Sequence, residues 1–576
     1  MALIDKASLL MVPSTYEAGK LYNVLPSGNR APDNKGGAGY DQTRADFDFD
    51  RGSNTAATRV NADGLIEKYR ENLLLNSNQF DTTWSSINTT ETSGQADKDG
   101  GTDAWLISKS ASGARVQQAI SVTGVQTFSV YAKANASNWI ALWTNVGTSY
   151  FDLSSGTKGS TGASTTIGSA MESVGNGWYR CSLIFNTSIS NVRIYPADGD
   201  LDTSGTTGSI YIQNAQLESG LVSTDYLDST SVTGKAGVLV DLPRINFDAN
   251  GENGSLLLEP SRQQLVPESE WFGTYGSNAN GTGSLPLVYT NNATSPDGYK
   301  NATKIVFDAG SGTTTGDESQ ISKNIGGLTT GADYTLSFYA KGENGGEEIV
   351  ARAVSGGYTK FTLTTEWKRY ELTQSAASTS YAIWFGVRQG LGGIGTINSN
   401  ATIWLWGVQE EAGSYPSSYI PNHGESGGVT RAADSCSVTG ASDVIGQTEG
   451  TFVMNLNYKH NQINTPLFET SKTNSNIYAL VLSDFKIRFW ITLSGSNEVV
   501  ITTSTIPSEG NHKLAVAYKQ NDACFYLDGV LVGNDTSCSI PAVSELYLNQ
   551  PNADVFEFIH FNERLENAEL ATLTTL

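Results

Sequence analysis

A long, diverged internal repeat constrains the fold of this chain more than any other feature of its sequence. One copy starts with Leu-Ile-Glu at residues 65–67 and the other with Leu-Leu-Glu at residues 257–259, an offset of 192 residues. Solenoid repeats are about 20–50 residues long, and these copies are far longer. Each copy therefore has the size of a whole domain. Further matches occur in the same order in both copies: Arg70 with Arg262, Phe80 with Phe272, Lys133 with Lys341, Trp178 with Trp367, Arg180 with Arg369, Gln216 with Gln409, Glu218 with Glu411 and Tyr226 with Tyr419.

Within each copy, side chains alternate in character at the spacing of β-strands. In the run 400–406, Ile403 and Leu405 share one face and Trp404 and Trp406 share the other. Short apolar runs of this kind are separated by turns rich in Gly, Ser, Thr and Asn, and the chain contains 60 glycines. Alternation over many short strands predicts antiparallel β-sandwiches, of which the jelly roll fits best.

The sequence predicts an all-β chain of tandem sandwiches with an extended N-terminal arm. The arm is interrupted by Pro13 and by a glycine-rich run at 36–39, so we expect it to need a partner to become ordered. A short amphipathic helix is expected at 563–576. The expected segments are the arm (1–63), a jelly-roll domain (64–230), a linker (231–255), a second jelly-roll domain (256–422), a linker (423–444) and a different C-terminal sandwich (445–576).

Composition excludes several classes of function. The chain has 36 basic and 58 acidic residues, a net charge of −22, which argues against a nucleic-acid partner. No apolar run approaches the length of a membrane span, and the run 7–12 is too short for a signal peptide. The four cysteines show no pairing pattern, so we expect free thiols, as in a protein folded in cytoplasm.

The repeats resemble carbohydrate-binding modules of the jelly-roll type, as found in tail and fibre proteins of phages. The resemblance covers residues 64–230 and, more weakly, 256–422. It rests on the Tyr-Ala-Lys strand at 131–133, the Gly-Asn-Gly-Trp-Tyr-Arg segment at 175–180 and Ala-Gln-Leu-Glu-Ser-Gly at 215–220. The second copy lacks the glycines that precede the tryptophan in the first copy. The resemblance therefore does not imply that both copies bind the same ligand.

The C-terminal region resembles laminin-G-like and concanavalin A-like sandwiches. The resemblance rests on the Tyr-Leu-Asp-Gly-Val-Leu-Val hairpin at 526–532, whose Asp-Gly turn is a strong local signal, and on the ending at 558–565. Residues 47–53 and 57–61 resemble segments of phage structural proteins, and residues 430–434 partly repeat them. None of these motifs is catalytic.

Sugar binding requires aromatic rings that stack on the apolar faces of pyranoses, with polar neighbours for the hydroxyls. Trp139 and Trp143 are four residues apart and share one face of the predicted strand. In the second copy the candidates are Trp384, Arg388, Trp404 and Trp406. The alternative for every tryptophan is a place in the sandwich core, and we assign the repeated Trp178 and Trp367 to that role.

One segment suggests a metal ion, and no segment predicts catalysis. Asp198, Asp200 and Asp202 alternate as in calcium loops, so calcium is the one cofactor the sequence allows for, and a solvated turn is the alternative. The Gly-x-Ser-x-Gly run at 424–428 lacks the strand-to-helix context of a nucleophile elbow. The four histidines have no spacing typical of zinc sites. We therefore expect a protein that is not an enzyme.

These resemblances imply a structural protein of a phage virion, assembled in the host cytoplasm. As a tail fibre or receptor-binding protein it would contact host surface glycans, with several weak modules acting together. A homotrimer is expected by analogy, with the N-terminal arm bound to other virion proteins. Two alternatives remain open: a head fibre or capsid decoration protein, and a glycan-degrading tail enzyme.

Overall fold

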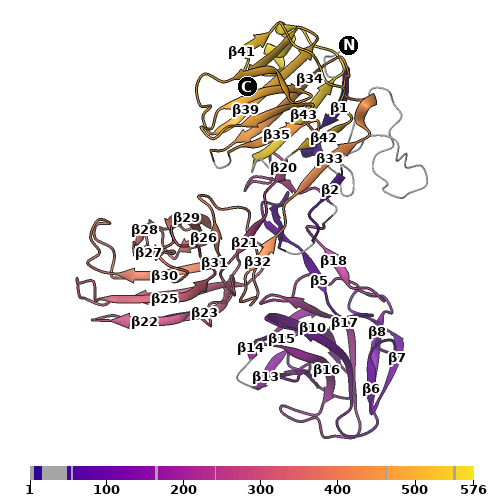
Figure 1. The fold of residues 1–576 in the computed structure, drawn as a ribbon. Helices are drawn as coiled ribbons and strands as arrows, with labels where there is room; N and C mark the ends of the chain where they lie inside the picture. The colour runs from indigo at the N-terminus through magenta and orange to yellow at the C-terminus, as the bar shows by residue number, and fades with distance from the viewer. Residues whose placement is uncertain are drawn as a thin grey trace.

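The computed structural model describes residues 6–15, 48–53, 56–162, 166–240, 242–460, 463–548 and 553–576. These residues form three antiparallel β-sandwiches, which Figure 1 shows with the first repeat at the bottom, the second in the middle and the C-terminal sandwich at the top. The only α-helix of the described residues is α1 (Asn567–Leu573), inside the segment where the sequence predicts one. The expected all-β architecture of tandem sandwiches is confirmed.

The first module, residues 64–230, consists of two packed six-stranded sheets, and the chain crosses repeatedly between them as in a jelly roll. Ile140 and Leu142 lie in the core, whereas Trp139 and Trp143 of the same strand lie on the outer face. One sheet has the order β14 (Thr166–Gly175), β15 (Trp178–Asn186), β10 (Val125–Ala134), β17 (Ser209–Ser219), β8 (Ala104–Lys109), β7 (Thr89–Gln95). The other has the order β13 (Thr157–Gly162), β12 (Gly147–Asp152), β11 (Trp139–Thr144), β16 (Ile189–Ala197), β9 (Arg115–Val122), β6 (Ser85–Ile87).

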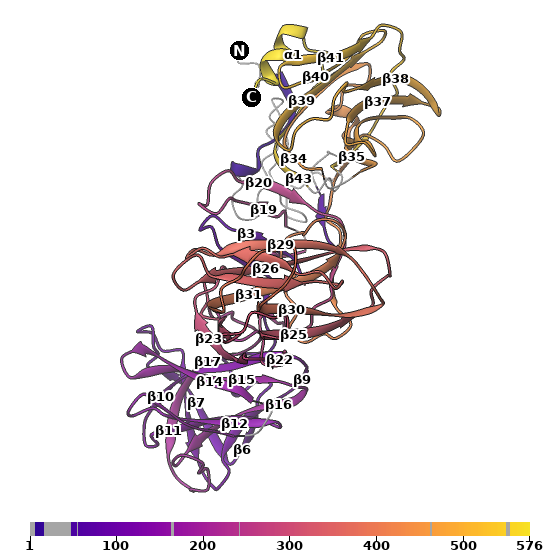
Figure 2. The same ribbon diagram turned by 90° about the vertical axis from the view of Figure 1, so that its left-hand side faces the viewer.

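The second module, residues 256–422, repeats this plan with two five-stranded sheets (Figure 2). Its core contains Phe338 and Phe385 from opposite sheets, with ring centroids 5.0 Å apart. One sheet has the order β22 (Gly276–Asn280), β25 (Glu318–Gly326), β30 (Ser380–Arg388), β27 (Glu348–Arg352), β28 (Thr359–Thr362). The other has the order β23 (Ser284–Ala293), β24 (Ala302–Asp308), β31 (Asn400–Ala412), β26 (Asp333–Gly342), β29 (Lys368–Ser375).

The C-terminal sandwich has two larger sheets, and helix α1 covers part of one outer face. Its β40–β41 hairpin turns at Asp528 and Gly529, both with positive φ, as the Asp-Gly signal predicts. One sheet has the order β19 (Ile245–Asn246), β20 (Ser255–Leu258), β43 (Ala553–Phe561), β34 (Glu449–Tyr458), β39 (Gly510–Lys519), β40 (Ala523–Leu527), β41 (Val530–Asp535). The other has the order β2 (Asp48–Asp50), β33 (Ser435–Thr439), β42 (Glu545–Leu548), β35 (Thr465–Glu469), β36 (Asn476–Val481), β37 (Ile487–Leu493), β38 (Ser496–Thr502).

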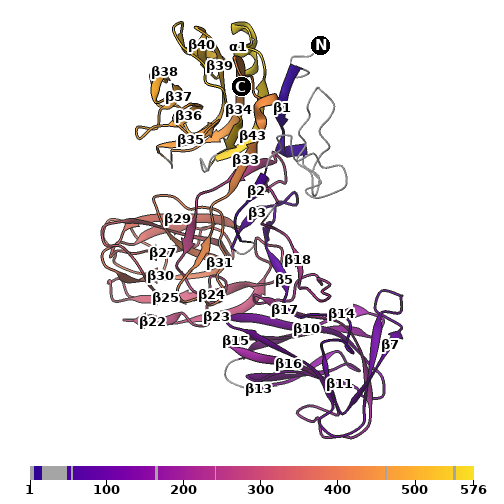
Figure 3. The same ribbon diagram turned by 45° about the vertical axis from the view of Figure 1, so that its right-hand side comes forward.

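The N-terminal segment differs from the extended arm that the sequence predicts. Strand β1 (Ala7–Met11) pairs with β43, as Figure 3 shows, and β2 pairs with β33. Leu9 and Met11 are buried in the core of the C-terminal sandwich, so this burial orders the strand without another protein. The glycine-rich run at 36–39 lies outside the described residues.

The two segments expected to be linkers also carry strands. Strand β18 (Gly234–Ala236) pairs with β5 (Arg70–Asn72), and β32 (Val429–Arg431) pairs with β21 (Arg262–Gln264). A ribbon of two strands therefore closes the base of each module. A third ribbon pairs β3 (Thr58–Val60) with β4 (Ile66–Lys68), across the start of the range predicted for the first module. Segment 231–255 then contributes β19, and segment 423–444 contributes β33, to the C-terminal sandwich.

The repeated residues form the same hydrogen-bonded clasp at the end of each module. In the first module, Thr224 donates to Glu218 through its backbone N–H, at 2.9 Å, and through its hydroxyl, and Arg180 donates to the Thr224 carbonyl. In the second module, Ser417 and Arg369 make the equivalent bonds around Glu411. The clasp satisfies a buried carboxylate in both copies, so the shared residues hold the scaffold together.

A buried ionic network joins the segments that meet between the second module and the C-terminal sandwich. Arg244 binds Glu259 at 2.8 Å and also pairs with Asp434, while Arg431 binds the same Glu259 oxygen at 2.8 Å. The Arg51 guanidinium lies 3.6 Å from Asp434. Burial alone would raise the pKa of Glu259, but Arg431 and Arg244 outweigh it and lower that pKa well below its usual range.

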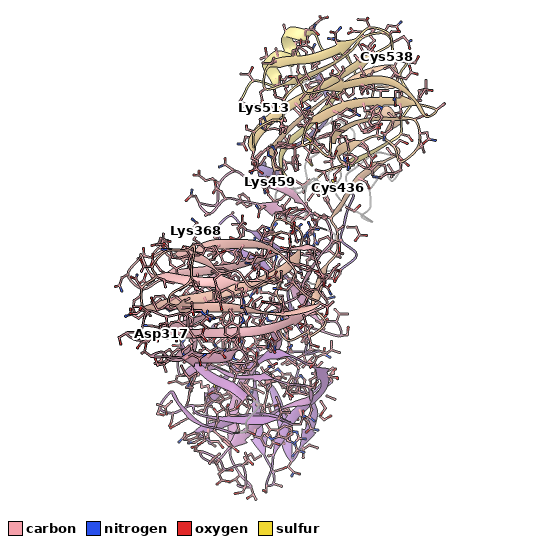
Figure 4. The ribbon with its side chains drawn as sticks, turned by 60° about the vertical axis from the view of Figure 1, so that its left-hand side comes forward. Asp317, Lys368, Cys436, Lys459, Lys513 and Cys538 are labelled. Atoms are coloured by element: carbon pink, nitrogen blue, oxygen red, sulfur yellow. The ribbon has the colours of Figure 1, made fainter. Side chains whose placement is uncertain are left out.

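The four cysteines are buried free thiols, as the sequence predicts. Burial raises the pKa of the Cys524 thiol to about 11, so this thiol is protonated at neutral pH. Figure 4 shows Cys436 and Cys538 at opposite ends of the C-terminal sandwich.

One buried carboxyl breaks the symmetry of the repeat. Glu410 occupies the position that Leu217 holds in the core of the first module, and both residues have no exposed surface. Neither carboxylate oxygen of Glu410 has a hydrogen-bond partner in the described part of the chain. Burial, with the neighbouring Glu411 charge, raises the pKa of Glu410 well above its usual range, so the folded protein holds this carboxyl in its neutral form.

Replacing Glu410 with Leu should stabilise the second module by about 1–3 kcal/mol, because an unpaired buried polar group is exchanged for the apolar one of the first copy. The raised folded-state pKa also means that this carboxyl favours folding fully below the unfolded value near 4.5. That contribution is lost as pH rises toward the folded-state pKa. Calorimetric melting between pH 4 and 8 should show a smaller decline with pH in Glu410→Leu, with Leu217→Met as a conservative control. An unchanged pH profile would contradict this account.

Replacing Arg244 with Met should destabilise the interdomain junction by about 3–5 kcal/mol, because the carboxylates of Glu259 and Asp434 would remain buried with one guanidinium fewer. Urea unfolding followed by tryptophan fluorescence measures the effect. Lys486→Gln is the control, since its ion pair with Asp484 is largely in solvent and its loss should leave the curve unchanged. Equal curves for Arg244→Met and the wild type would show that the network does not stabilise the junction.

Candidate functional site

Two tryptophans chosen from the sequence lie on one outer, partly buried aromatic face of the first module. Trp139 and Trp143 are half-buried on the outer side of β11, and Ala141 lies between them. The register pairs Ala141 with Tyr150 on β12 and with Tyr195 on β16. Four aromatic rings therefore surround one small residue, and we call Trp139, Trp143, Tyr150 and Tyr195 the aromatic face.

Charged groups border the aromatic face. The Arg193 guanidinium lies 3.7 Å from the centroid of the Trp143 ring and donates to the Tyr195 hydroxyl at 3.3 Å. Arg115 lies over Tyr195 at 5.7 Å. Partial burial and the Asp200 carboxylate raise the pKa of Tyr150, which keeps its hydroxyl a donor at neutral pH. The face thus offers ring surfaces together with donors and acceptors.

A glycine makes room for one of these rings. Any side chain at Gly159 would begin 2.6 Å from both the Trp139 ring and the Asp200 carboxylate. Asp200 accepts hydrogen bonds at 2.8 Å from the backbone N–H and from the hydroxyl of Ser160. Strand β13 therefore supports Trp139 from one side and fixes an acceptor beside it.

The three aspartates proposed for calcium do not converge. Asp198 is bound by the ammonium group of Lys109 at 2.6 and 2.7 Å, and Asp200 is bound by Ser160. Asp202 accepts hydrogen bonds from the backbone and hydroxyl of Ser204 within its own turn. No group of three His, Cys, Asp or Glu residues suited to a metal ion occurs in the described residues. Each aspartate is engaged by a different group, and Asp200 lies beside the Trp139 ring.

The candidates in the second module are divided between its two sheets. Trp384 and Arg388 lie on the outer face of β30, where Arg352 lies 5.2 Å from the Trp384 ring centroid and Arg388 pairs with Glu318 at 3.0 Å. Trp404 lies on the outer face of β31, in the opposite sheet. These residues therefore cannot form one site.

Trp406 is not available to a ligand, contrary to the prediction. It has no exposed surface and packs against Ile66 and Tyr419, with the Tyr419 ring centroid 4.7 Å away. Ile66 belongs to β4, which is about 340 residues earlier in the chain. Alternation within β31 puts Trp406 on the outer face, and a distant strand then covers it.

Sequence reasoning missed the tyrosines and the arginine of the aromatic face. In β16, Val192 and Ile194 point inward while Arg193 and Tyr195 point outward, an alternation that the sequence contains. The C-terminal sandwich also has an outer aromatic pair, Tyr478 stacked on Trp490 with centroids 5.4 Å apart. In this pair, one face of each ring is covered by the other ring.

One Ser–His–Asp arrangement resembles a catalytic triad but cannot act as one. The His512 Nδ1 lies 2.6 Å from the Asp528 carboxylate. The Nε2 lies 2.8 Å from the Ser508 carbonyl oxygen and 3.4 Å from its hydroxyl. The close contact of Nε2 is therefore with a carbonyl oxygen and not with the serine hydroxyl, as a nucleophilic serine would require. The Gly-x-Ser-x-Gly run at 424–428 forms a turn followed by strand β32, with no helix.

A polar cleft of about 660 Å³ lies between the second module and the C-terminal sandwich. Lys459 lines it from the sandwich, at the end that faces the second module (Figure 4). Two of its carboxylates are engaged: Asp554 lies 3.5 Å from the Lys459 ammonium, and Glu509 accepts the backbone N–H of His460 at 2.7 Å.

Comparison with known proteins yields likeness only at the level of β-sandwich domains. No protein-family model and no curated protein sequence matches the chain. A tandem pair of carbohydrate-binding modules from Paenibacillus barcinonensis Xyn10C covers 63% of this chain and 98% of its own, at 12% identity and a TM-score of 0.20. Domains LG4-5 of the mouse laminin alpha1 chain cover 39% and 79%, at 11% identity and a TM-score of 0.16. A botulinum neurotoxin type C structure covers 25% of this chain, which spans only 39% of that toxin chain, at 12% identity and a TM-score of 0.22. The fold assignment rests on strand order and register.

Proposed function

We propose that this chain is a non-enzymatic glycan-binding protein, and that the aromatic face of the first module is a binding site. The observation that carries the proposal is the placement of Trp139, Trp143, Tyr150 and Tyr195 around Ala141 on an outer sheet face. The four rings lie outside the main core of the module and pack against one another, with Tyr195 buried, and the partly exposed rings of the other three suit the C–H faces of sugars.

The polar border supports the same ligand class. Arg193, Arg115 and the tyrosine hydroxyls donate hydrogen bonds, and Asp200 accepts them, so both requirements of a sugar hydroxyl are met beside the rings. The site is an open face and not a deep pocket, which suits a chain of sugars lying across the strands. Several modest contacts of this kind gain strength when more than one copy binds one surface.

The double variant Trp139→Ala/Trp143→Ala should weaken glycan binding roughly tenfold, since each aromatic contact contributes about 0.5–1.5 kcal/mol. A glycan array of bacterial polysaccharides identifies the ligand, and calorimetry with that ligand measures the loss. Tyr211→Ala removes an aromatic side chain from the opposite sheet of the same module and is the matched control. If the wild type binds no glycan on the array, or if the double variant binds as tightly as the wild type, the site is rejected.

We propose further that the protein belongs to a phage virion and contacts host glycans as a tail fibre or receptor-binding protein. The support is the resemblance of residues 47–53, 57–61 and 175–180 to segments of phage proteins. Antibody against the first module, viewed on virions by electron microscopy, tests this placement. We expect label at the tail. Label on the capsid would favour a head fibre or decoration protein, and unlabelled particles would reject a virion protein.

A further inference from the structure

A row of alternating aromatic and lysine side chains crosses the outer face of the second module. Strand register pairs Tyr289 on β23 with Lys304 on β24, Lys304 with Trp404 on β31, and Trp404 with Lys341 on β26. Lys341 also lies 5.3 Å from the ring centroid of Trp367, which precedes β29. We call these five residues the basic aromatic row. Trp367 is partly exposed, contrary to the core position predicted for it, whereas its counterpart Trp178 is buried as predicted.

The rings and the ammonium groups of the row are held in place. Lys304 and Lys341 lie 5.2 and 5.5 Å from the Trp404 ring centroid. The indole N–H of Trp404 donates to the Asn292 side chain at 3.1 Å, and that of Trp367 donates to the Thr294 carbonyl at 3.0 Å. The surface is therefore ordered before any ligand arrives, which lowers the entropy cost of binding.

Apolar side chains extend the row at the sheet edge. Tyr289 is 47% exposed, and Leu285 and Leu287 of the same strand are 60% and 54% exposed. Exposed apolar groups gathered on one strand mark a contact surface more often than single ones do.

The fold does not require the complete row, because the first module has only part of it. The corresponding positions on β7, β8, β17 and β10 are Thr92, Leu106, Tyr211 and Lys133, linked by the same register. Lys304 and Trp404 thus replace a leucine and a tyrosine, and Tyr289 replaces a threonine. The second module has acquired one more cation and a longer aromatic surface on an unchanged scaffold.

The charge of the row differs from that of the whole protein, which carries a net charge of −22. Lys304 lies 2.8 Å from Glu343, and the two side chains are 25% and 42% exposed, so a ligand carboxylate can compete for this lysine. Lys341 has no carboxylate within ion-pair distance in the described part of the chain. Two ammonium groups between three rings complement a polymer that presents both carboxylates and apolar ring faces.

We propose that the basic aromatic row binds an acidic polysaccharide, with uronate carboxylates on Lys304 and Lys341 and sugar C–H faces on Trp404 and Trp367. Adjacent strands are about 4.8 Å apart, so the rings recur about every 10 Å across the sheet, comparable with the length of a disaccharide. The inference goes beyond the proposed function, because it concerns a different module, a different surface and a charged ligand.

The test uses the full chain with polygalacturonate as the probe and its methyl ester as the uncharged match. We expect the wild type to bind the acid form at least tenfold more tightly than the ester, with an affinity that falls as salt is added. Lys304→Gln/Lys341→Gln and Trp404→Ala should each weaken binding to the acid form at least tenfold, whereas Lys304→Arg/Lys341→Arg should retain it.

Lys360→Gln is the matched control, because Lys360 pairs with Glu348 at 2.9 Å on the opposite sheet of the same module. Melting curves of all variants verify folding. Absent binding, equal affinity for the ester, or equal loss in Lys360→Gln would overturn the proposal, as would lysine-dependent binding of single-stranded DNA without binding of the polyuronate. Glycan binding by the first module is measured separately and should persist in Lys304→Gln/Lys341→Gln, so the two proposals fail independently.

Discussion

The arrangement of this molecule depends on charge buried where four chain segments meet. Arg51, Arg244 and Arg431 come from segments that flank the modules, and they surround Glu259 and Asp434 in a site closed to water. Burial lowers the pKa of Arg51 to about 10. This value is still far above neutral pH, so the Arg51 guanidinium stays charged, as do those of Arg244 and Arg431. Such a network tolerates little displacement, because each charge needs its partner. It therefore fixes how the second module joins the C-terminal sandwich.

The two modules show how a repeated scaffold separates support from recognition. The clasp around Glu218 in the first module and the clasp around Glu411 in the second contain the same hydrogen bonds. The residues that form them therefore recur in both copies of the sequence. The outer faces differ: one module presents the aromatic face, and the other presents the basic aromatic row. The Gly-Asn-Gly segment at 175–177 is the turn of the β14–β15 hairpin, with positive φ throughout, so its loss in the second copy changes a turn and not a ligand contact.

Local alternation allowed much of the fold to be predicted, since Ile403 and Leu405 do lie in the core and Trp404 lies outside it. The same rule placed Trp139 and Trp143 together. It could not foresee that Ile66 covers Trp406, or that Leu9 and Met11 complete a sandwich over 400 residues away, because these contacts depend on chain path and not on neighbouring residues. The spacing of the three aspartates could not reveal their partners for a related reason, because Lys109, which binds Asp198, is remote in sequence.

Pairing between β1 and β43 has a consequence for biosynthesis. Leu10 pairs with Ile559, so β1 cannot reach its place in the sheet until synthesis has passed β43. Both modules can close their own cores earlier, as domains generally do during translation. Strand β1 must meanwhile remain without its partner β43, with Leu9 and Met11 outside their core. Completion of the C-terminal sandwich is thus a late, long-range event that depends on β1 and β43 together.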